Sequence, residues 1–330
     1  MKPHIQLQTS TTVNSNQLEL IKSAILAPSS HNTQPWKFHL EKKSISIFPD
    51  FSRRCPIVDP DDHHLFVSLG CAAENLVQAA RARGQMTEAL IDFDQNHKIE
   101  FHLSPTKSVQ NSLSQAIAIR QCTRTEYNGQ KLSSDEVRIL TDAGSGNGVH
   151  CHMFTEKNSL EKILEFVVQG NTSQMNDPAF ITELKTWIRF NNHEAKNSGD
   201  GLYSLTTGSP NIPTWLGKII FKKVFKVKKE NEKYCKHIRS SAGIAVFTSE
   251  KNDIKHWIEV GRCYERFALQ ATLMDIRSAM INQPVEVAKI RPVFANYLGI
   301  GKQRPDLVIR FGRGPIAPRS MRRKPQSILV

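Results

Sequence analysis

A ten-residue segment near the N-terminus brings together two serines, two amide side chains and two prolines beside a tryptophan. It reads Ala27-Pro28-Ser29-Ser30-His31-Asn32-Thr33-Gln34-Pro35-Trp36. The hydroxyl and amide groups can donate several hydrogen bonds next to an apolar wall, which suits a flat molecule with polar edges. A polar turn that bonds only its own backbone is the alternative. No GxSxG sequence surrounds either serine, so a hydrolase nucleophile is not indicated.

Two arginines four residues apart form a second candidate cluster. They belong to the stretch Arg120-Gln121-Cys122-Thr123-Arg124-Thr125-Glu126-Tyr127. Near a helix end, side chains at this spacing lie on one face. Arg120 and Arg124 can therefore present forked donors to one phosphate group. The alternative is that both are ordinary surface arginines.

Two further segments lie in the C-terminal part of the chain. One is Asn282-Gln283-Pro284-Val285-Glu286, and the other is Met321-Arg322-Arg323-Lys324-Pro325. The first follows a long predicted helix and is otherwise explained as a loop that proline interrupts. The second is a basic segment that suits an anionic group, and a solvated tail is its alternative.

No metal site or separate dinucleotide-binding domain is predicted. Six cysteines are scattered without CxxC spacing, which favours a reducing compartment over zinc or a disulfide framework. His150 and His152 share one face of a predicted strand, but no cysteine or carboxylate lies nearby at ligand spacing. Gly144-Ser145-Gly146-Asn147-Gly148 is not GxGxxG and follows a helix, the reverse of a Rossmann turn. We expect His63 and His64 in a loop before a helix.

The bulk properties describe a globular chain of 330 residues with a net charge of +13. No apolar run is long enough to span a bilayer, and the first residues lack the apolar core of a secretory signal. We therefore expect a cytoplasmic protein. No nucleic-acid-binding motif accompanies the positive charge, and no nucleic-acid partner is expected.

Hydrophobic periodicity predicts a mixture of helices and strands, which indicates an α+β fold. A helix is expected from Ser15 or Asn16 to about residue 25, and Ser133 with Glu136 forms a capping box for another. The remaining helices are expected near residues 68–83, 112–121 and 253–275. Strands are expected at 36–40 and 45–47 (a hairpin), 89–94, 99–104, 149–153, 243–248 and 307–311.

The chain also contains a weak internal repeat. Gly70 and Gly261, Glu74 and Glu265, and Ala80 and Ala271 match at an offset of 191, whereas Phe38 and Phe154 match at 116. The difference, 191 − 116 = 75 residues, predicts an insertion in the second half at about 157–236.

The first segment resembles the loop that the nitroreductase superfamily of FMN enzymes places over the flavin. The arginine pair resembles the family's R-x-S/T-x-R/K signature, except that Cys122 replaces a hydroxyl and is a weaker donor. The other two segments are similar to its P-x-E loop and its basic C-terminal segment. The resemblance implies cofactor contacts from Ser29, Ser30, Asn32, Gln34, Pro35, Arg120, Arg124, Pro284, Val285, Glu286, Arg322 and Arg323.

Together with the repeat, the resemblance implies a nitroreductase-like fold made of two fused half-repeats that mimic a nitroreductase dimer, as in the Acg-type branch. The first half is expected at 1–108 and the second at 109–330. The serine–amide turn lies in the first half, and the other three segments lie in the second. One composite FMN site between the halves is therefore expected. Further oligomerisation stays open.

The insertion contains Pro210-Asn211-Ile212-Pro213-Thr214-Trp215, followed by apolar residues at helical spacing with lysines on the remaining face. A packed helix, a lid over the flavin and a membrane-surface helix are three open interpretations. Fused members of the family are thought to place an insertion over the flavin, which favours the lid.

The function that the resemblance implies is electron transfer from NAD(P)H through FMN to a small acceptor such as a nitroaromatic or quinone. No side chain is named as catalytic, because the flavin carries the chemistry. The alternative is a flavin-binding or flavin-storing protein with little turnover. A basic membrane-surface or nucleic-acid-binding module is a third interpretation, which would predict no flavin.

Overall fold

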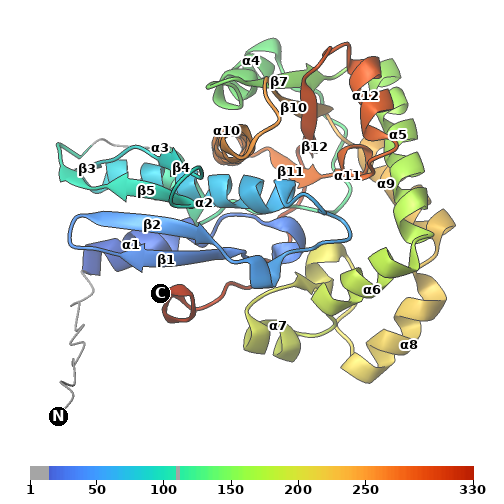
Figure 1. Cartoon of the computed structure of the whole chain (residues 1–330). Helices are drawn as coiled ribbons and strands as arrows, with labels where there is room; N and C mark the ends of the chain where they lie inside the picture. Colours follow the sequence, from blue (N-terminus) through green and yellow to red (C-terminus); the bar gives the residue numbers. More distant parts are fainter. Residues whose placement is uncertain (1–14, 109–111) are drawn as a thin grey trace.

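The structure, a computed structural model, describes residues 15–108 and 112–330. It contains two four-stranded antiparallel sheets (Figure 1). The first has the order β1-β2-β5-β4, with β1 (Trp36–Leu40), β2 (Ser44–Pro49), β4 (Leu90–Asp92) and β5 (Lys98–His102). The second has the order β11-β12-β10-β7, with β7 (Val149–Phe154), β10 (Gly243–Ser249), β11 (Arg277–Met280) and β12 (Arg304–Gly312). The expected α+β organisation is confirmed.

Helices pack around and between these sheets. They are α1 (Ser15–Ala24), α2 (His63–Ala82), α3 (Ser112–Ile117), α4 (Ser134–Ala143), α10 (Ile254–Leu273), α11 (Gln283–Glu286) and α12 (Arg291–Leu298). Two short strands, β3 (Gln85–Met86) and β6 (Ser104–Pro105), form a separate two-stranded antiparallel sheet.

The two halves follow one order of elements along the chain. The first runs α1, β1, β2, α2, β4 and β5, with the short β3 between α2 and β4. The second runs α4, β7, β10, α10, β11 and β12, with further helices between β7 and β10 and between β11 and β12. When these elements are matched in chain order, the two sheet orders are the same. Each half also has a loop between its first helix and first strand, and the serine–amide turn fills that place in the first half.

The long helices α2 and α10 cross at the centre of the molecule and touch through glycines. A Cβ atom at Gly70 would overlap the carbonyl oxygen of Ile258, and one at Gly261 would overlap that of Val67. Val67 and Ile258 are themselves 191 residues apart, so the two contacts are reciprocal. Only glycine allows the backbones to approach this closely. One apolar core cluster runs through this crossing and contains residues of both halves.

The predicted insertion is a helical subdomain between β7 and β10. It comprises α5 (Lys157–Met175), α6 (Pro178–Trp187), β8 (Ile188–Arg189), α7 (Asn192–Ser198), β9 (Leu202–Tyr203), η3 (Ser204–Thr207), α8 (Thr214–Val224) and α9 (Val227–Arg239). Figure 1 shows α6, α7 and α8 at one side of the molecule, beyond both sheets. Asp200 anchors this subdomain to the first half, because its carboxylate accepts from Arg53 as well as from Arg189.

The C-terminal segment leaves the second sheet after β12 and returns to the first. The short helix η4 (Pro325–Ile328) packs near α1 and β1, and Val330 N donates to Phe38 O at 3.0 Å. Residues of the second half therefore complete the edge of the first sheet, as Figure 1 shows for the C-terminus beside β1.

Most predicted elements are confirmed, including the capping box in which Glu136 N donates to Ser133 Oγ and Ser133 N to Glu136 Oε2. Two boundaries are wrong. Helix α2 begins at His63 rather than at Ser68, so His63 and His64 are buried helix residues and not a loop. Helix α3 ends at Ile117, well before residue 121.

The interpretation of the N-terminal residues concerns positions 1–14, which lie outside the described residues. Within 15–108 and 112–330, no helix combines the length and the hydropathy needed to cross a membrane.

Candidate cofactor-binding site

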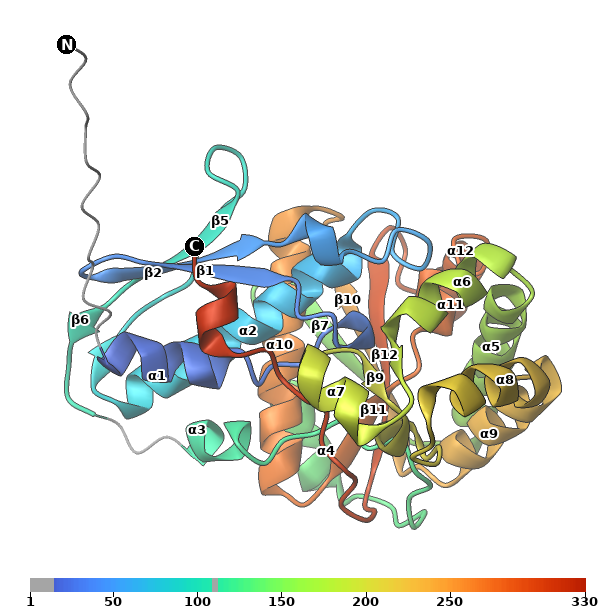
Figure 2. The ribbon, with the colours of Figure 1, turned by 90° about the horizontal axis from the view of Figure 1, so that it is seen from below.

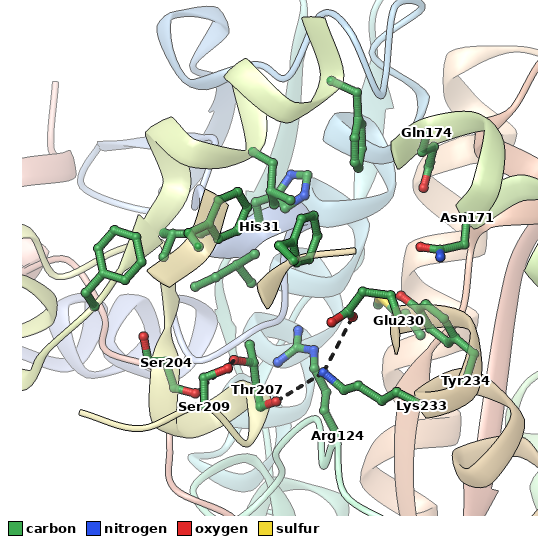
Figure 3. A pocket seen from close by; sticks show the side chains of 18 of the residues that line it. His31, Arg124, Asn171, Gln174, Ser204, Thr207, Ser209, Glu230, Lys233 and Tyr234 are labelled. Atoms are coloured by element: carbon green, nitrogen blue, oxygen red, sulfur yellow. Dashed lines mark hydrogen bonds and ion pairs between the residues drawn. The ribbon is translucent and has the colours of Figure 1, made fainter. Parts of the chain in front are cut away.

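A cavity of about 390 Å³ lies between the serine–amide turn, the second sheet and the helical subdomain. Figure 3 shows that its labelled polar residues come from widely separated parts of the chain. The turn contributes Ser29, Ser30 and His31, and the second half contributes Arg124 and the stretch around Gln283. The volume lies within the usual range of small-molecule sites. The cavity is thus built by both halves.

The turn holds an uncommon backbone conformation. His31, Asn32 and Gln34 all have positive φ angles, of 48°, 56° and 55°. Residues other than glycine rarely adopt this region, and its cost is tolerated where surrounding contacts fix the chain. One such contact runs inside the turn, where Gln34 N donates to Ser29 Oγ at 2.9 Å. The strained turn directs Ser29, Ser30 and His31 toward the cavity.

His31 is uncharged in this position. Burial, reinforced by the positive charge of Arg124 and by His64, lowers the pKa of His31 to about 4. Its Nδ1 lies 3.6 Å from Cys55 Sγ. Because His31 is neutral, Arg124 supplies the positive charge at this edge of the cavity.

The two amide residues of the turn face away from the large cavity and hold other segments in place. Gln34 is fully buried; its Nε2 donates to Gly199 O at 2.8 Å and its Oε1 accepts from Arg323 N at 2.8 Å. Asn32 Nδ2 donates to Gly201 O and Met321 O, each at 3.1 Å. Both side chains therefore tie the turn to the helical subdomain and the C-terminal segment. Pro35 does not line the cavity.

The arginine pair divides between two environments. Arg120 is buried: its Nε lies 3.0 Å from Glu265 Oε1, and it donates to Leu26 O at 2.8 Å. Burial opposes the charge of Arg120, but Glu265 raises its pKa above the ordinary value. Arg124, in contrast, lines the cavity and makes no hydrogen bond or ion pair with the described residues. Arg124 is the member of the pair with free donors.

A smaller cavity of about 70 Å³ adjoins the first and shares Ser29 and Arg124 with it. Four arginines line it, namely Arg120, Arg124, Arg319 and Arg322. Several of their donors are already engaged; Arg319 donates to Ala118 O, for example. The electrostatic character of this small cavity is nevertheless cationic, which suits a phosphate group.

The two arginines of the C-terminal segment contact the turn itself. Arg322 donates to Asn32 Oδ1 at 3.0 Å and to Leu26 O at 2.9 Å. Burial and the nearby Arg120 lower the pKa of Arg322 to about 10. Arg323 donates to Gln34 O at 3.1 Å and does not line either cavity. The segment is therefore bound in the structure, and it is not a frayed tail.

The proline segment contributes its polar ends to the large cavity and its centre to the core. Gln283 and Glu286 line the cavity, whereas Pro284 and Val285 are buried outside it. Gln283 Nε2 donates to the hydroxyl of Tyr234, but its buried Oε1 has no hydrogen-bond partner. Burial raises the pKa of Glu286, although His64 and Gln174 oppose the shift. An unsatisfied acceptor is thus available at the cavity wall.

The helical subdomain supplies polar cavity residues that no sequence motif had indicated. Asn171 and Gln174 on α5 and Glu230, Lys233 and Tyr234 on α9 line the cavity, and Figure 3 shows Lys233 linked to Thr207 and Glu230. Lys233 Nζ lies 3.3 Å from Thr207 O and 3.8 Å from Glu230 Oε2. Helical spacing alone did not single out these residues, because it does not show which face meets a ligand.

The same subdomain supplies an apolar wall opposite the polar residues. These wall residues are Phe180, Leu184, Ile188, Phe190, Leu202, Ile212, Ile220, Phe221 and Phe225. Phe221 and Phe225 stack with ring centroids 4.4 Å apart. A cavity with one apolar aromatic wall and one polar rim suits a flat, amphiphilic ligand.

One group of metal-ligating side chains lies close together among the described residues: Asp59, His63 and His64. Their atoms are already used in the fold. Both oxygens of Asp59 accept backbone N–H groups, at 3.0 and 2.9 Å, and His63 Nε2 lies 2.8 Å from Asp306 Oδ1. We therefore assign this group to the packing of the α2 N-terminus. His150 and His152 bond Glu250 and Thr248 respectively.

Comparison with known proteins finds no family model that matches the chain. The chain is similar to "Putative NAD(P)H nitroreductase Rv3131" of Mycobacterium tuberculosis H37Rv, and equally to its counterpart in strain CDC 1551. Each is 26% identical over 308 residues, which cover 89% of this chain and 83% of the relative.

Solved structures give partial matches. An FMN-bound nitroreductase of Bacteroides fragilis has a TM-score of 0.39 at 12% identity and covers 65% of this chain and 95% of its own. The FMN-dependent nitroreductase NfnB of Mycobacterium smegmatis, in complex with NADPH, has a TM-score of 0.40 at 10% identity, with 62% and 87% covered. The chain is therefore similar along most of its length to proteins that are named as putative NAD(P)H nitroreductases.

Proposed function

We propose that the chain is an FMN-binding oxidoreductase that moves electrons from NAD(P)H to a small acceptor such as a nitroaromatic or a quinone. The observation that carries this proposal is that the serine–amide turn and Arg124 line the same two adjoining cavities. The names of the M. tuberculosis relatives agree with it.

The residues present fit a flavin mononucleotide. The aromatic wall suits a planar ring system, and the orphaned Oε1 of Gln283 can accept a hydrogen bond from its polar edge. The phosphate belongs in the small arginine-lined cavity, where Arg124 has free donors. Ser29 and Ser30 add hydroxyl groups to the rim. Asn32 lines the small cavity and also holds the turn, whereas Gln34 and Arg323 contact the turn without lining either cavity.

FMN, when bound, supplies the two-electron chemistry, and the protein supplies position and polarity. Arg124 would balance negative charge on the cofactor. The apolar wall around Phe221 and Phe225 excludes water from the face that it covers. The proposal assigns no side chain as an acid or base, because the flavin would carry the chemistry.

We further propose that the chain is a fused duplication of the Acg type, with halves at 1–108 and 109–330 and a lid-like insertion. Two observations support it: the matching order of elements and strands in the halves, and the reciprocal contacts of Gly70 and Gly261. Glu74 and Glu265, which are matched in the repeat, are both buried beside arginines. Glu74 pairs with Arg262 and Arg266, and Glu265 pairs with Arg120.

A flavin-storing protein with little turnover is the second candidate. It is favoured by the large share of the cavity wall that the helical subdomain supplies, because a wall of this kind limits which electron acceptors reach a bound flavin. Cytoplasmic location belongs to the proposal for either function.

The absorption spectrum of the purified full-length protein, before and after NADPH is added without oxygen, tests the proposal. A flavin band that NADPH or NADH bleaches is the result expected of the oxidoreductase. A band that persists with both reductants would favour storage. If the protein contains no flavin and cannot be loaded with FMN, the proposal is wrong.

A further inference from the structure

Helix α8 carries two large apolar side chains on its outer surface. Trp215 is 66% exposed and Ile219 is 47% exposed. They are four residues apart and therefore lie on one helical face. Figures 1 and 2 place α8 at the outer edge of the molecule, away from both sheets. Nothing in the described part of the chain covers this face.

The same region is strongly and uniformly positive. Residues 214–229 contain six lysines and no aspartate or glutamate. Lys218 and Lys223 are exposed, and their spacing from Trp215 places them along the same side of α8. Lys226 is also exposed and lies immediately before α9. None of these three lysines forms an ion pair with the described residues. The fold therefore leaves both the charge and the apolar groups without an internal partner.

The opposite face of α8 already accounts for its attachment to the protein. Gly217 packs against the ring of Phe190, and Ile220 and Phe221 line the cavity. Trp215 and Ile219 are not among the cavity residues. Their exposure is thus not required by the packing that holds the helix.

We propose that this outer face of α8, with the lysines that begin α9, docks the protein on an anionic lipid membrane. Trp215 and Ile219 would enter the interfacial layer, where tryptophan is favoured, and the lysines would meet lipid phosphates. A peripheral helix of this kind lies in the plane of the membrane and does not span it. The inference goes beyond the proposed oxidoreductase function and does not depend on it.

Membrane docking accounts for the patch better than binding of nucleic acid does. A phosphate backbone would meet the lysines, but it would leave the aliphatic Ile219 against water or charged groups. A lipid surface accepts both kinds of side chain at once, because its charged and apolar layers are stacked. An oligonucleotide control makes the other binding mode an outcome of the test.

The test is co-flotation of the full-length protein with phosphatidylcholine vesicles that do or do not contain phosphatidylglycerol. Wild-type protein is expected to float with the anionic vesicles only. Trp215→Ala combined with Ile219→Ala should lower the bound fraction about tenfold or more. Lys218→Gln, Lys223→Gln and Lys226→Gln together should remove the dependence on phosphatidylglycerol.

A matched control changes the same number of exposed lysines elsewhere: Lys251→Gln, Lys255→Gln and Lys302→Gln. This control should float like the wild type. If wild-type protein stays unbound, or if the control loses as much binding as the α8 variants, the docking proposal is overturned. Binding to an oligonucleotide without flotation would overturn it as well. Flavin content, measured on the same samples, reports separately on the proposed function.

Discussion

Arg322 donates a hydrogen bond to Oδ1 of Asn32 at 3.0 Å, across 290 positions of the sequence. Each of these residues was expected to contact the cofactor, and in the structure each also holds the other. Asn32 donates in turn to the carbonyls of Gly201 and Met321. The amide is therefore the point at which the turn, the helical subdomain and the C-terminal segment join.

Asn32→Asp should destabilise the protein, because a carboxylate keeps the acceptor for Arg322 but faces the two carbonyl oxygens that the amide served. We expect a loss of about 1–3 kcal/mol in the free energy of unfolding, measured by denaturant titration. Asn128→Asp is the control, since the exposed Asn128 uses only its oxygen, which accepts from Gln130 N. Equal stability of the two variants would contradict this role of Asn32.

Arg124→Ala should weaken FMN retention, because Arg124 is the cavity arginine whose donors are free. A charged hydrogen bond of this kind contributes enough for a loss of about ten- to a hundredfold in affinity. Equilibrium dialysis of the flavin measures it. Arg138→Ala removes an exposed arginine on α4 and should leave the affinity unchanged. Undiminished flavin binding by Arg124→Ala would remove the phosphate assignment.

Gly261→Ala should be severely destabilising, because its new methyl group would overlap the carbonyl oxygen of Val67. The two central helices would have to move apart, at a cost of about 3 kcal/mol or more. Thermal unfolding followed by circular dichroism checks this. Gln270→Ala on the same helix serves as the control, since its side chain is only half-buried. A normal melting temperature for Gly261→Ala would show that the crossing can relax.

Phe221→Ala should open the cavity by removing one ring of the stacked pair. If the helical subdomain limits access, kcat/KM for a bulky quinone should rise relative to a small one, on the order of tenfold. Ile219→Ala shortens an outward side chain of the same helix and, in assays without lipid, should leave the ratio as in the wild type. An unchanged ratio in Phe221→Ala would count against the lid.

His31 should make stability fall in mild acid. Its folded-state pKa of about 4 lies below the ordinary 6.5, so the unfolded chain binds a proton that the folded chain rejects. The associated loss begins below about pH 6.5, is complete near pH 4, and amounts to at most about 3 kcal/mol. His31→Asn, which tolerates the positive φ, should flatten the stability profile in this window. A profile as steep as that of the wild type would assign the effect to other groups.

Much of the fold was predictable because its signals are local. The hairpin of β1 and β2, the capping box at Ser133 and the length of α10 all follow from alternation, caps and periodicity. The start of α2 was not predictable in this way. His63 and His64 are polar and look like loop residues, but both side chains are buried against Asp306, which lies on β12 and is more than 240 residues away in the sequence.

The site was predictable by residue type and less so by role. The resemblance led us to expect the turn and the arginine pair at one site, and Ser29 and Arg124 line both cavities. It could not separate Arg124 from Arg120, because the difference depends on Glu265, 145 residues further along the chain. Nor could it reveal Gln174 or Tyr234, whose position depends on how the helical subdomain packs.

The wall of the large cavity is covalently continuous, since Ser29 and Arg124 belong to one polypeptide. If these residues came from two separate subunits, they would meet only at protein concentrations above the dissociation constant of the dimer, and the site would be lost on dilution. Within one chain, the local concentration of Arg124 around Ser29 is set by the residues that connect them and does not change with the amount of protein. The retention of a bound cofactor should therefore be independent of protein concentration, down to the level set by the affinity of the site itself.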